Sequence, residues 1–272
     1  METTSIDGLT LFFDADEQDA AELIGRACER SSRLIRQSWG LETPEDCRVY
    51  VMTSWLRFMF HSAPWHWRVL LVPSLPLWCL RVRRTWRYAG GWMQRYGNRK
   101  AVGVKPPRIL ELADRSVGVR MFVPEDDLSR KVEQVTCHEL THAFTAHLRL
   151  PMWLNEGVAM LTVDRLAGCP TVVRDTVETL HRSSSGADPA GYRDVRWSDQ
   201  DALVYHTVRG YWIVRYLEEK HPGVLRSMLS QRHGQEVLED KVAAELGMRR
   251  DALWAGIDGV VADHFLEQET SA

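Results

Sequence analysis

The chain has 272 residues, of which 44% are hydrophobic and 26% are charged, and its formal net charge is −3. This length can bury a sizeable core in one large or two small domains, and the composition is that of an ordinary globular protein. The small net charge gives no whole-chain signal for nucleic-acid or membrane binding. The five cysteines are scattered and lack CxxC spacing, so neither a disulfide framework nor a thiolate metal site is predicted.

The first half of the chain predicts strands interrupted by one long helix. Residues 9–13 and 47–53 are expected to be strands, and residues 17–39, with apolar side chains at helical spacing, a helix between them. Residues 102–104 and 117–123 are expected to be further strands, the second directly before another helix. The result is a small mixed sheet.

The segment 54–100 is rich in tryptophan and arginine. Two prolines interrupt its apolar run, so a regular spanning helix is not predicted. Three interpretations stay open: tryptophans packed in the core with arginines outside, an interfacial membrane surface, or a surface for a protein partner or nucleic acid. The residues concerned are Trp55, Trp65, Trp67, Trp78, Trp86 and Trp92, with Arg57, Arg68, Arg81, Arg83, Arg84, Arg87, Arg95, Arg99 and Lys100.

The motif with most chemical content is His138-Glu139-Leu140-Thr141-His142. Two histidines four residues apart on a helix lie one turn apart on one face, so both imidazoles can bind one metal ion. Glu139 beside them can act as general base toward a bound water. A solvated helix with two surface histidines is the alternative. The apolar residues Val132, Val135, Leu140 and Phe144 argue against it, and Asp126 or Asp127 is the expected N-cap.

A second motif, Trp153-Leu154-Asn155-Glu156-Gly157, follows at a usable distance. Glu156 comes fourteen residues after His142, far enough for the chain to turn and begin a new helix. The carboxylate would complete a His-His-Glu set with the fourth position left to water, which is typical of a catalytic zinc site.

The rest of the chain predicts helices only. They are expected at residues 153–166, 174–182, 199–220, 223–231, 234–246 and 250–265. We therefore expect an α+β protein with an N-terminal α+β subdomain, residues 1–125, that carries the Trp/Arg-rich segment. Residues 126–272 would form the zinc helix and an α-helical C-terminal subdomain.

The two motifs together resemble those of the gluzincin metallopeptidases, and the short spacer is most similar to the peptidase MA-like proteins, or minigluzincins. The resemblance covers roughly residues 115–220 and implies a zincin-like fold. It implies zinc bound by His138, His142 and Glu156, with Glu139 as catalytic base. It also implies that the strand before the zinc helix pairs with an extended peptide substrate.

One feature of the family is missing. Aminopeptidase N-like enzymes stabilise the oxyanion with a tyrosine whose position here is Thr207. Tyr211, one turn further on, is the expected substitute, whereas His206 and Tyr205 point elsewhere. A packed side chain remains the alternative for each of them. The motif that captures a free N-terminus in the aminopeptidase branch is also absent, which favours an endopeptidase.

Two functional hypotheses follow. The first is a zinc endopeptidase acting on peptides or proteins. The second is a catalytically weak or inactive protein of the same fold that binds a membrane or a protein partner through residues 54–100. No nucleic acid is expected as a partner. The acidic start, Met1 to Asp7, lacks signal-peptide features, so we expect a cytoplasmic protein with a peripheral membrane contact as an option.

Overall fold

The computed structural model describes residues 1–69, 72, 73, 75, 85–113, 115–182, 189, 191, 192, 194, 195 and 199–270. The chain divides into two compact units, the first formed by residues 1–119 and 124–146 and the second by residues 120–123 and 147–272. Trp78, Arg81, Arg83 and Arg84 of the Trp/Arg-rich segment lie outside the described residues.

A five-stranded mixed sheet forms the centre of the first unit. Its strands are β1 (Glu2–Ile6), β2 (Leu9–Phe13), β3 (Asp46–Val51), β4 (Gly91–Tyr96) and β5 (Arg99–Val104), in the order β1-β2-β3-β5-β4. The three inner strands are parallel, and the outer strands β1 and β4 run antiparallel to their neighbours. The α+β class and three of the four expected strands are thus confirmed.

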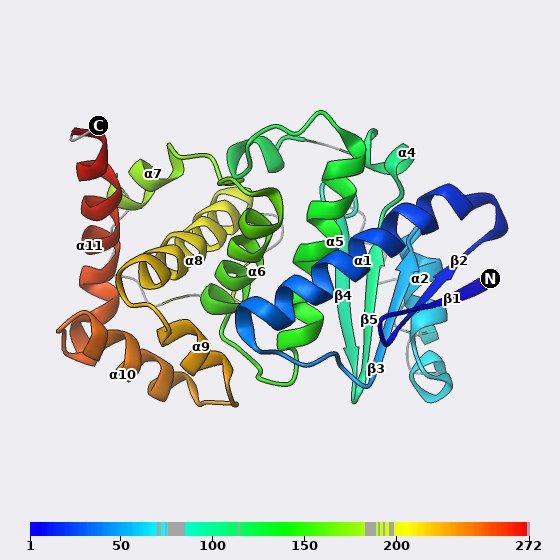
Figure 1. Cartoon of the computed structure of the whole chain (residues 1–272), viewed down its shortest axis with the longest axis horizontal. Helices are drawn as coiled ribbons and strands as arrows, with labels where there is room; N and C mark the ends of the chain where they lie inside the picture. Colours follow the sequence, from blue (N-terminus) through cyan, green and yellow to red (C-terminus); the bar gives the residue numbers. More distant parts are fainter. Residues whose placement is uncertain are drawn as a thin grey trace. The chain divides into compact units, whose positions relative to one another are not determined.

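Helices cover both faces of this sheet. The helices α1 (Gln18–Trp39) and α5 (Leu128–Thr145) pack against each other and against the strands, as Figure 1 shows. Strand side chains alternate between faces, so the buried Val49 and Tyr50 of β3 point in opposite directions. Tyr50 joins a core cluster with Phe58 and Met59 of α2 (Trp55–Ser62). The sheet is therefore buried on both faces.

Two local predictions for the first unit were wrong. Residues 117–123 contain the 3-10 turn η2 (Gly118–Arg120) and an isolated bridge from Phe122 to Val172, not a strand. No strand was expected at residues 91–96, but these residues form β4, the edge strand beside β5. Four more short elements were not predicted from the sequence: β1, α2, η1 (Ala15–Glu17) and α4 (Pro107–Leu110).

The second unit is helical, as predicted. Its helices are α6 (Met152–Ala167), α7 (Thr176–Arg182), α8 (Gln200–Lys220), α9 (Val224–Leu229), α10 (Gln235–Glu245) and α11 (Arg250–Thr270). The close approach of α6 and α8 requires two glycines, because a Cβ on Gly157 would overlap the carbonyl oxygen of Gly210, and a Cβ on Gly210 that of Trp153. A buried ion pair, Arg209 to Asp258 at 2.7 Å, joins α8 to α11.

The division between the units differs from the expected one. The predicted boundary at residue 125 placed the motif helix with the helical half, but α5 packs on α1, β4 and β5 and belongs to the first unit. Among the described residues, none of the helices combines the length and the apolar character needed to cross a membrane.

Candidate metal centre

The helix α5 fixes the orientation of the first motif. Asp127 caps its N-terminus by accepting hydrogen bonds from the backbone N–H groups of Ser129 (2.8 Å) and Arg130 (3.3 Å), so the expected cap is confirmed. Leu140 and Phe144 are fully buried on its core face. A helix anchored in this way holds its remaining face in a fixed position, and His138, Glu139 and His142 project from that face.

The two motif histidines converge at their ring nitrogens. The Nε2 atoms of His138 and His142 lie 3.0 Å apart, and the ring planes are nearly perpendicular, at 87°. Two nitrogen ligands of a tetrahedral zinc ion, each about 2.0–2.1 Å from the metal, would lie about 3.3 Å apart. The pair therefore fits one zinc ion with a small adjustment of the rings, and the alternative of two independent surface histidines does not fit this geometry.

Glu139 lies against the edge strand. A Cβ added to Gly91 of β4 would come within 2.5 Å of its Cγ and 3.0 Å of its Cδ and Oε1 atoms. Only a glycine therefore leaves room for the side chain of Glu139 in its present position. Gly90 is similarly close to Val135 of α5, so the Gly90-Gly91 pair lets β4 approach the motif helix.

Cys137, next to His138 in the sequence, does not share this face. Its side chain is fully buried, and burial raises the pKa of its thiol to about 12. A protonated, buried thiol is a packing residue.

Glu156 belongs to the second unit, in the first half of α6. Its Oε1 atom accepts a hydrogen bond of 2.6 Å from the hydroxyl of Tyr192, and that hydroxyl accepts one of 2.6 Å from the side-chain amide of Asn155. The chain Asn155–Tyr192–Glu156 orients the carboxylate. Tyr192 was not singled out in the sequence, because no motif or periodic pattern surrounds it.

Tyr211 does not have the position expected of an oxyanion donor. It is fully buried in α8, and its hydroxyl donates to Asp164 at 2.7 Å and accepts from Arg215 at 2.9 Å. Burial raises its pKa further above the usual range. The prediction for Tyr211 is corrected on this ground: its hydroxyl is part of a satisfied buried network, which corresponds to the packed alternative.

The other polar residues considered near the motifs also have structural contacts. Asp164 accepts hydrogen bonds from the Thr171 backbone N–H and hydroxyl, both at 2.7 Å, as well as from Tyr211. It is therefore a buried residue of the helical core. Tyr205 donates to Asp258 at 3.0 Å, which ties α8 to α11.

The structure thus gathers His138, Glu139 and His142 on one helix of the first unit, and it places Glu156 with Tyr192 in the second. Comparison of the sequence with models of known protein families and with curated proteins finds no match.

Proposed function

We propose that the protein is a zinc-dependent peptidase of the gluzincin type, with a zincin-like fold. The observation that carries the proposal is the pair of Nε2 atoms at 3.0 Å with Glu139 between the two histidines in the sequence. A convergent imidazole pair beside a carboxylate is the donor set of a hydrolytic zinc site.

Glu156 is the proposed third ligand. It belongs to the second motif, and its carboxylate completes the His-His-Glu set that the resemblance implies. Its hydrogen bond from Tyr192 supports this role, because ligating carboxylates are usually held by an outer hydrogen-bond donor. Two nitrogens and one carboxylate leave a fourth position open, as catalysis requires.

The chemistry follows from the residues around this site. When bound, zinc lowers the pKa of its water toward neutrality and polarises a carbonyl group. Glu139 takes the proton of the attacking water and delivers it to the leaving amine. Its contact with Gly91 keeps the carboxylate in one orientation during both transfers.

The strand β4 is the proposed platform for an extended peptide. It is one of the two outer strands of the described sheet, and it contacts α5, so it takes the role that the resemblance gave to residues 117–123. A peptide pairing with β4 would use main-chain hydrogen bonds and would tolerate many sequences. Such binding favours cleavage inside a chain, so we propose an endopeptidase.

Metal content and casein cleavage by the purified protein test the proposal together. Wild type should hold one zinc per chain and cleave casein, and His142→Ala should lose both properties. His147→Ala is the matched control, since it removes an exposed histidine five residues further on and should change neither. Equal zinc in wild type and His142→Ala would refute the site.

A second candidate function is a membrane- or partner-binding protein of the same fold without strong catalysis. It is favoured by one observation: the hydroxyl of Tyr211 is buried and bonded to Asp164, so it is not accessible as an oxyanion donor. Zinc binding without cleavage of casein or of an N-terminally blocked peptide would select it.

A further inference from the structure

The Trp/Arg-rich segment has two kinds of tryptophan. Trp55 is buried, and Trp86 and Trp92 pack against the same core cluster, so the core interpretation holds for these three. Trp65 is 77% exposed and Trp67 is 42% exposed. An indole with three quarters of its surface in water is unusual enough to require a reason.

The exposed tryptophans are accompanied by other exposed apolar side chains. In the part of the chain that the structure describes, twelve large hydrophobic residues are exposed, and six of them fall between residues 56 and 72. They are Leu56, Phe60, Trp65, Trp67, Val69 and Val72, and we call them the apolar patch. Leu56 and Phe60 lie one turn apart on the outer side of α2, while Phe58 and Met59 of the same helix are buried.

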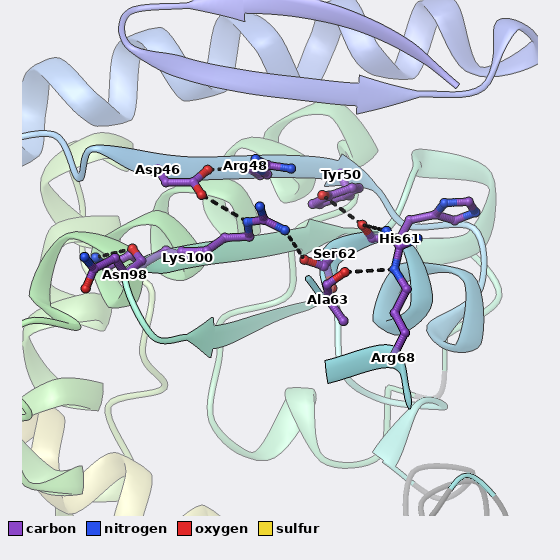
Figure 2. A network of polar contacts seen from close by, with 10 residues as sticks. Asp46, Arg48, Tyr50, His61, Ser62, Ala63, Arg68, Asn98 and Lys100 are labelled. Atoms are coloured by element: carbon purple, nitrogen blue, oxygen red, sulfur yellow. Dashed lines mark hydrogen bonds and ion pairs between the residues drawn. The ribbon is translucent and has the colours of Figure 1, made fainter. Parts of the chain in front are cut away.

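Hydrogen bonds fix the end of α2, the helix that carries part of the apolar patch. The last carbonyl groups of α2 and of the residue after it accept hydrogen bonds from three side chains, as Figure 2 shows: Tyr50 to His61 (3.5 Å), Arg99 to Ser62 (3.3 Å) and Arg68 to Ala63 (2.9 Å). Arg99 is in turn fixed by Asp46 at 3.0 Å. The guanidinium of Arg68 also lies 5.0 Å from the ring centre of Phe60, so it links the residues after α2 to the helix.

Along the sequence, the charge of the segment that carries the patch has one sign, although in the structure Arg57 pairs with Asp14 and Arg99 with Asp46. From Cys47 to Leu110 the sequence contains twelve Arg and Lys residues and no Asp or Glu. Since the whole chain has a formal charge of −3, the remaining residues carry −15. A segment of 64 residues without an acid, in a chain that is otherwise strongly acidic, predicts an anionic partner.

We infer that the apolar patch, with Arg68 beside it, docks the protein on an anionic lipid surface. Exposed aromatic rings beside cationic side chains suit the headgroup level, where Trp and Phe enter the acyl boundary and Arg meets the phosphates. The aliphatic side chains Leu56, Val69 and Val72 decide against single-stranded nucleic acid, since base stacking would use the aromatic rings but would leave these three in water. This inference is independent of the zinc site.

Sedimentation with vesicles tests it on the full chain. The protein should pellet with vesicles of phosphatidylcholine and phosphatidylglycerol at low salt, should be released at high salt, and should stay in solution with phosphatidylcholine alone. Trp65→Ala should lower the partition coefficient about tenfold, or about 1.4 kcal/mol. Leu112→Ala is the matched control, because Leu112 is 85% exposed but lies outside the acid-free segment, and it should leave binding unchanged.

Three outcomes would overturn the inference. The first is that the protein does not pellet with the anionic vesicles at low salt. The second is that Trp65→Ala and Leu112→Ala lower vesicle binding equally. The third is that a single-stranded oligonucleotide displaces the protein from the vesicles at a lower phosphate concentration than the lipid presents. Because Trp65 is so exposed, Trp65→Ala should unfold at the same urea concentration as wild type, which separates lost docking from lost folding.

Discussion

Replacing Gly91 with alanine tests whether the edge strand β4 positions Glu139, the proposed catalytic base. The new Cβ would lie 2.5 Å from Cγ of Glu139, whereas carbon atoms in contact prefer about 3.5–4.0 Å. The side chain of Glu139 must therefore move by about 1 Å. A misplacement of this size costs about a hundredfold in rate, or about 2.7 kcal/mol in the activation barrier.

The assay measures kcat, KM, zinc content and urea unfolding of Gly91→Ala. We expect kcat to fall about a hundredfold with zinc content unchanged, since His138 and His142 are not touched. Gly234→Ala is the control, because a Cβ there meets nothing within 4 Å. Wild-type activity and stability in Gly91→Ala would refute the contact between β4 and the base. Loss of zinc would show that the change disturbs the whole helix.

Four further predictions concern single side chains. Glu139→Gln should keep zinc and lose roughly a hundred- to ten-thousandfold in kcat; an unchanged rate would assign the activity to another site or a contaminant. Tyr192→Phe should weaken zinc affinity about 10- to 100-fold, measured by competition with a chelator, because it removes the donor that orients the proposed carboxylate ligand. Tyr211→Phe should lower the unfolding free energy by about 1–3 kcal/mol by leaving buried Asp164 short of a donor, with kcat nearly unchanged; the opposite pattern would restore the oxyanion role. Burial lowers the pKa of Lys105 to about 8 from its ordinary 10.5, so between these two pH values the unfolded chain binds more protons than the folded chain. The unfolding free energy of wild type, measured in urea relative to Lys105→Met, should therefore rise as the pH increases through this range.

Periodic segments were predictable from the sequence, and segments shaped by tertiary contacts were not. The six helices of the second unit follow from apolar spacing, and β2, β3 and β5 follow from runs of β-branched and aromatic residues. β4 was not predicted because a Gly-Gly pair is typical of a turn. In the structure, Gly90 and Gly91 instead leave room for the side chains of α5 beside the strand. Residues 117–123 alternate like a strand, yet the structure has only the bridge at Phe122 within them.

The metal-binding residues of the candidate site could be proposed from the sequence because their chemistry depends on helical spacing. A four-residue separation is enough to bring two imidazoles together, and the structure places the Nε2 atoms 3.0 Å apart. The side chains that orient these groups are far away in the sequence: Tyr192 is 36 positions from Glu156, and Gly91 of β4 meets Glu139 only because α5 packs on the sheet. No local pattern encodes such pairs.

The failure at Tyr211 has a physical cause that also explains the position of Tyr192. Helical geometry put Tyr211 on nearly the same face as Thr207, but that face of α8 packs on α6, where Gly157 and Gly210 bring the backbones together. A tyrosine in so close an interface must have its hydroxyl satisfied internally, and Asp164 of α6 accepts it. The hydrogen bond from Tyr211 of α8 to Asp164 of α6 thus holds the two helices together and fixes the position of α6. A hydroxyl beside Glu156 then has to come from outside the pair, and the segment before α8 supplies it through Tyr192.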